Sequence, residues 1–406
     1  MEENYIDTTV SKVPDYEISE LAFVLSQPTL SHLHNDSKLS LLSKVESLHM
    51  APYYKYLTDS YLKNVLVFDD NLYQNLVNEN NIKINELKEN LIKIDKNDEG
   101  ELEQAQAYIK LGEYYAQIGD KENAIENLEI AMSKEISTGA KIDIMLTITR
   151  LGFFYNDYIF VKEKLDLINS MLEKGGGDWE RRNRYKTYKG IYCMATRDFD
   201  EAANLLVDSL ATFTSNELIS YENLATYASV TGLFVLQRTD LKLKIIDSPE
   251  LLSLISSNTA LQTISSLTIS LYTCDYSSFF PFLLETHEKV LLPCKYLNKH
   301  ADYFMRKMRR KVYEQLLESY KTLSLKSMAS AFGVSVEFLD NDLGKFIPNK
   351  QLNCIIDRVN GIVDTNRPDN KNSQYHLLIK QSDGLLTKLQ KYGTAVKLTG
   401  SSERVA

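Results

Sequence analysis

The stretch from Leu323 to Asn366 constrains the fold most, because it carries helix-capping signals followed by hairpin signals. Ser324 can cap a helix over residues 325–332 by accepting a first-turn N–H. Gly333 then permits the left-handed turn that ends this helix. Ser335 offers a second cap in front of another amphipathic segment. The first part of the stretch therefore predicts two short helices joined by a tight turn.

The second part of the same stretch predicts a β-hairpin. Pro348 prevents the second helix from continuing. Residues 352–359 and 362–365 are rich in β-branched side chains and flank Asn360 and Gly361. An Asn-Gly pair between two such runs indicates a two-residue hairpin turn, in which both residues have positive φ. Helix, turn, helix and hairpin in this order predict a winged helix over residues 323–366.

Charge argues against nucleic acid as the partner of this winged helix. Its second helix would enter a groove, yet it carries Glu337, Asp340 and Asp342 against Lys345. Affinity for nucleic acid comes mainly from cations that neutralise phosphates. A role in protein–protein contacts is favoured, and a nucleic-acid-binding winged helix is kept as the weaker alternative.

A repeated pattern of small and apolar residues precedes the winged helix. It follows the tetratricopeptide pattern at Tyr108, Leu111, Gly112, Tyr115, Gly119, Ala124, Leu128 and Ala131. It recurs at Leu151, Gly152 and Tyr155, and more weakly at Gly190, Ala202 and Leu206. Small residues let two antiparallel helices approach, and large apolar residues fill the seam between them. The pattern predicts a right-handed helical solenoid.

The composition is typical of a soluble globular protein. With 406 residues, 44% hydrophobic and 25% charged, the chain can form two or three domains with sizeable cores. A net charge of −9 disfavours polyanions and anionic lipid as partners. Four cysteines without a CxxC pair fit a reducing compartment. Neither a signal peptide nor an apolar run of roughly 18 residues is evident. We expect a protein of the cytoplasm and nucleus without a membrane partner.

The sequence shows no catalytic or cofactor motif. The glycines at 175–177 are not followed by GK[ST] and follow no strand, so they are interpreted as the end of a helix. His32, His34, Ser43 and Glu46 approach the HxH metal signature of deubiquitinases. However, the serine is one position late and the last ligand is Glu, which the ligand geometry does not tolerate. We expect no catalytic residue, no metal and no cofactor.

A final helix is expected over residues 373–392, after a break at Pro368. Its mainly apolar seam positions follow a spacing of three and four, at Tyr375, Leu378, Ser382, Leu385, Leu389 and Tyr392. This spacing is typical of a coiled-coil seam, which needs a helical partner.

Helical repeats that run into a winged helix and then a terminal helix are the order of the PCI domain. The runs GELEQAQAYIKLGEYYAQIGD, GDWERRNRYKTYKG, IIDSPELLSLI and LKSMASAFGVSVEFLDNDLGKFIPNK extend the likeness well beyond that domain. The chain closely resembles the subunit-seven family of non-ATPase subunits in the 26S proteasome regulatory lid, in a yeast-like form. The resemblance starts near Val13 and is weakest over residues 30–95.

This resemblance implies a mostly α protein: a right-handed tetratricopeptide-like solenoid, then a winged helix and a C-terminal helix. It implies a non-catalytic structural subunit that supports lid assembly and ubiquitin-dependent protein degradation. In such proteins, winged helices associate edge to edge and C-terminal helices gather into a bundle. The implied partners are other PCI and MPN subunits of a hetero-oligomeric complex, with the ATPase ring as a further candidate.

Two surfaces are expected to contact these partners. A hairpin edge offers unpaired N–H and C=O groups to a neighbouring strand, and the terminal helix offers an apolar stripe. The candidate interface residues are Ile356, Val359, Ile362 and Val363 on the hairpin, and Tyr375, Leu378, Leu385 and Leu389 on the helix.

The chain is expected to comprise four parts. These are an N-terminal helical region (1–100), helical repeats (101–215), the PCI domain with its winged helix (216–370) and the C-terminal bundling helix (371–406). The same architecture would also suit a scaffold subunit of the signalosome or of a translation initiation factor complex. Identification of co-purifying proteins would distinguish these complexes.

Overall fold

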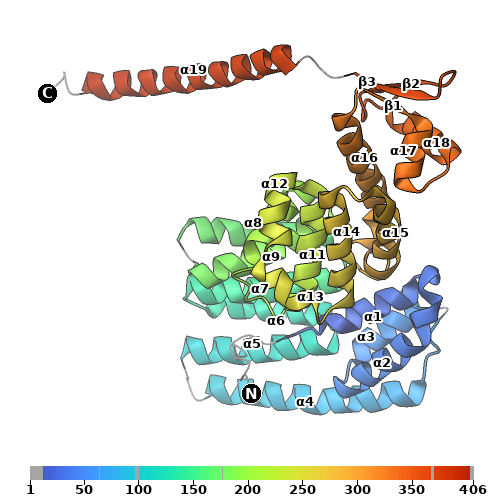
Figure 1. Ribbon diagram of the computed structural model, residues 1–406. Helices are drawn as coiled ribbons and strands as arrows, with labels where there is room; N and C mark the ends of the chain where they lie inside the picture. The colour runs from blue at the N-terminus through green and yellow to red at the C-terminus, as the bar shows by residue number, and fades with distance from the viewer. Residues whose placement is uncertain (1–11, 64, 97–99, 176, 367–369, 403–406) are drawn as a thin grey trace. The chain divides into compact units, whose positions relative to one another are not determined.

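The computed structural model describes residues 12–63, 65–96, 100–175, 177–366 and 370–402. It forms two compact units, residues 1–308 and 309–406 (Figure 1). The described part of the first unit contains helices and no strands, and the second unit combines helices with a small sheet. The predicted architecture, a helical solenoid followed by a winged helix and a terminal helix, is confirmed. The four-part division of the chain stays a prediction.

The N-terminal helices form their own small core against the solenoid. They are α1 (Tyr16–Ser26), α2 (His34–Ser47) and α3 (Ala51–Tyr56). Helix α1 starts directly after Asp15, whose side chain accepts the Glu17 N–H at 3.0 Å. Tyr53 packs on Phe154 with ring centroids 4.8 Å apart. The N-terminal helices are thereby attached to the repeats.

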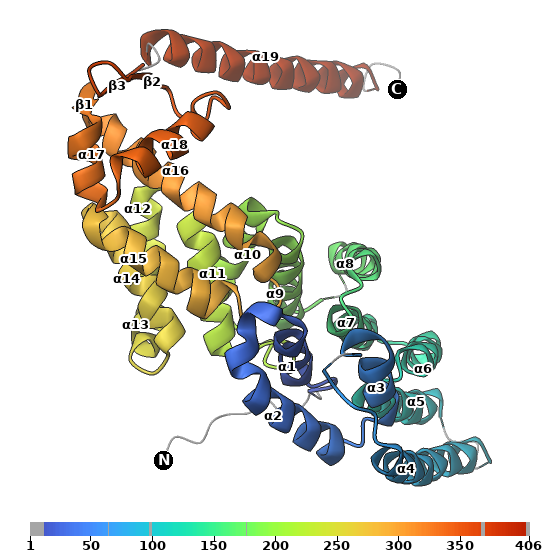
Figure 2. The ribbon, with the colours of Figure 1, turned by 90° about the vertical axis from the view of Figure 1, so that its right-hand side faces the viewer.

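The solenoid consists of successive antiparallel helices, several of which are viewed nearly along their axes in Figure 2. The series is α4 (Asp70–Lys96), α5 (Glu101–Ile118), α6 (Lys121–Lys134), α7 (Thr138–Phe154), α8 (Tyr158–Glu173), α9 (Trp179–Ala195), α10 (Phe199–Ser209) and α11 (Tyr221–Val235). Gly100 occupies the N-cap position of α5, so α4 and α5 are separate helices.

The same turn joins the two helices of each repeat. A residue with positive φ precedes the N-cap aspartate of the second helix, at Gly119-Asp120, Asn156-Asp157, Arg197-Asp198 and Cys274-Asp275. The side chains of the first three aspartates accept a first-turn N–H. In each case the aspartate N–H bonds to a carbonyl five residues earlier, which closes the end of the first helix. This local chemistry sets the antiparallel return of the chain.

Glycines at the predicted positions allow the paired helices to approach. A Cβ on Gly112 would lie 2.7 Å from Leu128 Cγ, and one on Gly190 would lie 2.7 Å from Leu206 Cδ2. A Cβ on Gly152 would be equally close to the helix that follows it. These distances are shorter than van der Waals contact, so the predicted repeat register is confirmed.

The remaining helices of the first unit lead toward the winged helix. They are α12 (Arg238–Leu241), α13 (Pro249–Ile255), α14 (Thr259–Thr273) and α15 (Tyr276–Thr286), with π-helical turns at Lys242–Ile246 and His287–Leu291 and a 3-10 turn at Asn298–His300. Helix α16 (Ala301–Ser319) begins in the first unit and continues into the second. Gly175 follows α8 with a φ of 88°, so the glycine run does end a helix, as predicted.

The second unit contains the winged helix, whose elements follow in the order β1 (Thr322–Ser324), α17 (Leu325–Phe332), α18 (Val336–Phe346), β2 (Cys354–Asp357) and β3 (Ile362–Thr365). Ser324 accepts the Ser327 N–H at 3.1 Å, and Ser335 accepts the Phe338 N–H at 3.2 Å. Gly333 has a φ of 66°. Both caps and the turn are as predicted. The strands form an antiparallel sheet in the order β1-β3-β2.

The hairpin turn is longer than predicted. Asp357 pairs with Ile362, so four residues make the turn instead of two. Gly361 has a positive φ of 66°, whereas Asn360 does not. The reason is that the Asp357 side chain accepts the N–H groups of Val359 (2.9 Å) and Asn360 (3.2 Å), which favours a wider turn.

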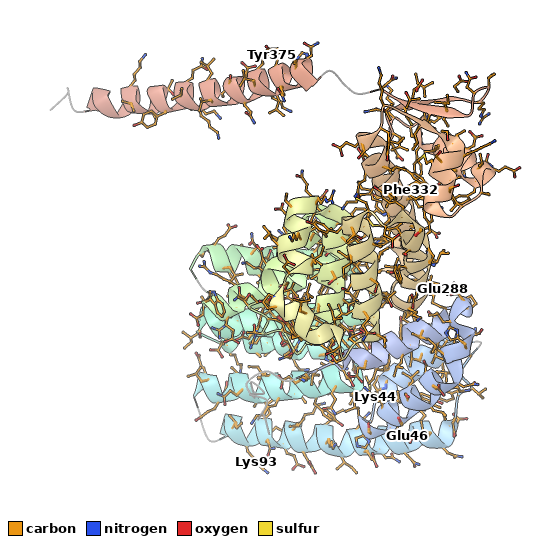
Figure 3. All side chains as sticks on the ribbon, in the orientation of Figure 1. Lys44, Glu46, Lys93, Glu288, Phe332 and Tyr375 are labelled. Atoms are coloured by element: carbon orange, nitrogen blue, oxygen red, sulfur yellow. The ribbon has the colours of Figure 1, made fainter. Side chains whose placement is uncertain are left out.

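The chain ends in one long helix, α19 (Asn370–Ser402), which exceeds the predicted range of 373–392 at both ends. Its described side chains extend from the helix on all sides, and Figure 3 labels Tyr375 among them. By contrast Phe332, also labelled there, is buried in the core of the winged helix.

Candidate protein interface

The winged-helix sheet has two edge strands, β1 and β2, and β2 is the edge strand of the hairpin. The N–H of Asn366 bonds to the carbonyl of Asn353 at 2.9 Å, so this is a hydrogen-bonded pair of the β2–β3 ladder. Bonded and non-bonded pairs alternate along an antiparallel ladder. Ile355 is therefore bonded to β3, whereas the N–H and C=O of Cys354 and Ile356 point away from it. These two residues present the groups that a partner strand would use.

Two of the four predicted hairpin residues, Ile362 and Val363, do not lie on an edge strand, because β3 is the central strand. It pairs with β1 on one side and β2 on the other. Val363 lies opposite both Leu323 and Ile356, and its side chain is fully buried. Ile362 is partly buried at the end of the same strand. Of the four predicted hairpin residues, Ile356 and Val359 remain interface candidates.

Apolar side chains are exposed beside this edge. Val359 at the tip of the turn is 94% exposed, and Ile355 is more than half exposed. The turn that carries Val359 is fixed by Asp357, and hydrogen bonds from Asn360 and Val359 hold the pKa of this carboxyl below its usual value. The exposed valine thus stands on an ordered turn.

Two of the three acidic residues of α18, Asp340 and Asp342, form ion pairs within the second unit. Asp342 is buried, and its Oδ2 lies 3.3 Å from Arg309 Nε and accepts the Tyr313 hydroxyl at 3.1 Å. Burial and this carboxylate raise the pKa of Tyr313. Asp340 lies 3.0 Å from Arg358 Nη2 on the hairpin. The surface of α18 is therefore less acidic than its sequence suggests, and the preference for a protein partner rests on the edge and on α19.

Helix α19 presents an apolar face that the structure leaves open. Tyr375, Leu378, Leu385 and Leu389 are each about 60% exposed, as the predicted seam requires of a helix without its partner. Ile379, Leu386, Tyr392 and Val396 are exposed as well. At 100° per residue, these eight positions form one continuous face that is wider than a two-stranded seam.

Sequence reasoning overlooked part of both surfaces. Ile379 and Leu386 each follow a predicted seam residue directly, so a search for a three-in-seven pattern would have found them. Strand β1 was also overlooked. It has three residues and is stabilised by pairing with a strand about forty residues later, which no local pattern reveals.

Other kinds of site were also sought. Within the described ranges, no three His, Cys, Asp or Glu side chains come together as a metal-binding group. No helix in the described part of the chain is long and apolar enough to cross a membrane.

A helical solenoid that runs into a winged helix defines the class of PCI-domain proteins, and the PCI-domain family model matches residues 284–367. A second family model, described as 26S proteasome subunit RPN7, matches residues 69–244. The 26S proteasome regulatory subunit RPN7 of Saccharomyces cerevisiae is 68% identical to this chain, over 98% of this chain and 97% of the length of the relative. The subunit rpn7 of Schizosaccharomyces pombe is 41% identical, over 95% of this chain and 96% of its own. The chain belongs to the RPN7 family of 26S proteasome regulatory subunits.

A signalosome protein shows a weaker likeness. COP9 signalosome complex subunit 1 of Arabidopsis thaliana is 26% identical over 47% of this chain and 42% of its own length. The proteasomal relatives match nearly the whole chain, whereas the signalosome relative matches about half of it.

Proposed function

We propose that the chain is a non-catalytic structural subunit of the 26S proteasome lid, a hetero-oligomeric complex of the cytoplasm and nucleus. Its partners are other PCI and MPN subunits, and the ATPase ring is a further candidate neighbour. Neither nucleic acid nor membrane is a partner in this proposal. Family membership supports the choice of complex, and the open surfaces of the second unit support the structural role.

The exposed apolar face of α19 is the observation that carries the proposal. A lone helix in water gains little from hydrogen bonding, and most helical stability in proteins comes from packing of an apolar face. In the described part of α19, the residues of this face are about half to two-thirds exposed. The width of this apolar face favours packing of α19 against several helices in a bundle over packing against one helix in a two-stranded coiled coil. The helix therefore fits a bundle formed with the terminal helices of other subunits.

The β2 edge provides the second contact. A partner strand can bond to the outward groups of Cys354 and Ile356 while Val359 adds an apolar contact beside them. Strand addition suits a ring or arc of related winged helices, because each one has an edge to offer and an edge to accept. The two surfaces would orient the chain between its neighbours.

Affinity purification of the tagged full-length chain from its own cells tests the proposal. We expect the lid subunits to co-purify in stoichiometric amounts and signalosome or initiation-factor subunits to be absent. Stoichiometric recovery of either of the other complexes in place of the lid would contradict the proposal. The purified lid should also contain the chain in one copy per complex.

A further inference from the structure

A short connector in the first unit carries an unusual set of buried polar groups. It spans residues 292–300 between the π-helical turn after α15 and the start of α16. Lys295 and Tyr296 are at least 95% buried, and His300 is 9% exposed. The ring of Tyr296 packs between those of Phe153 and Tyr227, with centroids 6.3 and 6.2 Å away. The connector thus passes through the core instead of over the surface.

The ammonium of Lys295 joins the connector to two distant parts of the chain. Its Nζ donates to the carbonyls of Phe153 (3.0 Å) and Phe154 (3.3 Å), which end α7, and to the hydroxyl of Ser19 on α1. Ser19 in turn donates its own proton to the carbonyl of Phe154 at 3.2 Å. A second bond from α1 to α7 runs from the Tyr16 hydroxyl to the carbonyl of Arg150.

In all three hydrogen bonds of Lys295, Nζ must be the donor. The Ser19 proton is used toward Phe154, so the Ser19 oxygen can only accept from Nζ, and backbone carbonyls can only accept. Three donated bonds match the three N–H groups of an ammonium. The carbonyl end of α7 also carries partial negative charge that favours a cation. Burial lowers the pKa of Lys295 to about 7, and the carboxyl of Glu20 on α1 opposes this effect.

The other end of the connector binds the next repeat in the same way. His300 accepts the Arg197 Nε–H at its Nδ1 (3.3 Å), so its Nε2 carries a proton and donates it to the carbonyl of Ala195, the last residue of α9, at 2.9 Å. Two side chains of one connector therefore cap the carbonyl ends of α7 and α9, which the repeat turns leave accessible.

We propose that Lys295 is a buried latch that couples docking of the N-terminal helices to packing of the connector that leads into α16. When α1 leaves its site, Lys295 loses the Ser19 oxygen and an ammonium is exposed to an incomplete set of acceptors. The connector is then destabilised as well, because a buried N–H donor that loses its acceptor is costly. Docking of α1 and ordering of residues 292–300 thus occur as one event. A partner that displaces α1 would loosen the start of α16 at the same time.

Amide hydrogen exchange on the full-length chain tests the latch. Lys295→Met keeps the length of the side chain and removes its donors. We expect exchange in α1 and in residues 292–300 to become about tenfold faster or more, as loss of charged hydrogen bonds implies. The matched control is Lys44→Met, which removes a more exposed lysine that also pairs with Asp15 at the start of α1. Exchange in the control should change less than twofold.

A second variant keeps the test decisive if Lys295→Met does not fold. Ser19→Ala removes the one oxygen that α1 offers to Lys295, and it changes no atom of the connector. If α1 and the connector are coupled, amide exchange in residues 292–300 should also become faster in Ser19→Ala. The effect of Ser19→Ala should be smaller in a chain that already carries Lys295→Met. The latch would be refuted by unchanged exchange in the connector of Ser19→Ala, or by additive effects of the two substitutions.

Discussion

At the scale of single residues, the solenoid depends on glycines at the contacts between its paired helices. Gly112 and Gly190 lie where a Cβ would overlap a leucine of the paired helix. Glycine lowers the intrinsic stability of a helix by about 1 kcal/mol relative to alanine. Close packing of the two helices compensates for this cost, so the position of each glycine marks the contact line between them.

Replacing Gly112 with Leu should therefore destabilise the first unit. Overpacking of this kind costs roughly 1–3 kcal/mol or more, which exceeds the gain in helix propensity. Thermal unfolding of the full-length chain would show a lower midpoint. The control is Gly344→Leu in α18, where a Cβ meets no atom within 4 Å. Equal midpoints for the two variants would show that the helices do not meet at Gly112.

Residue-level charges show why burial cannot be taken from sequence alone. Asp342 counts as an acidic surface residue by its position in an amphipathic helix, yet it is buried against Arg309 and Tyr313. Its partners come from α16, about thirty residues earlier. Likewise Lys295 and Ser19 are 276 positions apart. Such pairs are determined by tertiary packing, so the local periodicity of the sequence cannot predict them.

At the scale of elements, the boundaries that sequence predicted well are those with local chemical signals. Helix α17 and strand β3 have the predicted bounds because a serine cap, a glycine with positive φ and a glycine turn define them. The hairpin turn was predicted too short, since the hydrogen bonds of Asp357 outweigh the Asn-Gly preference. Ile362 and Val363 were predicted at a sheet edge although β3 is central, because strand β1 gives no local signal in the sequence.

The position of β2 at the edge of the sheet allows a test of whether a partner strand pairs with it. Proline at Ile356 removes an outward N–H and leaves the β2–β3 bonds in place, so this variant should fold. Ile356→Ala loses the same side chain and keeps the N–H. We expect the proline variant to enter the lid several-fold less well than the alanine variant, which corresponds to loss of one hydrogen bond of about 1 kcal/mol. Quantitative mass spectrometry of the purified lid would measure both.

The neighbouring position supplies the control for this assignment. Ile355 bonds to β3, so Ile355→Pro should disrupt the wing itself, visible as a lower melting midpoint than that of Ile356→Pro. Equal incorporation of the proline and alanine variants at 356 would exclude strand addition at β2.

At the scale of the whole molecule, the two units have different roles in the account. The first unit has an extensive apolar core, which joins repeat pairs, the N-terminal helices and the connector. The second unit keeps an open sheet edge and the exposed apolar face of α19. The second unit therefore carries the two surfaces that are proposed to contact other subunits.

The most direct test of the structural role is incorporation of a chain with Leu378, Leu385 and Leu389 all replaced by Ala. Each leucine is about 60% exposed, so the isolated variant should melt like the unchanged protein. In a bundle each fully buried leucine contributes roughly 2–5 kcal/mol, although neighbouring sites do not add independently. The variant should therefore fail to enter the lid.

Leu377 provides the matched control, because it is equally exposed on the same helix and lies off the apolar face. The decisive measurement is the fraction of lid particles that contain each variant, compared between Leu385→Ala, Leu377→Ala and the triple substitution. The account predicts normal incorporation for Leu377→Ala, reduced incorporation for Leu385→Ala and little or none for the triple variant. Normal incorporation of a folded triple variant, or its unfolding in isolation, would contradict the claim that α19 packs on other subunits.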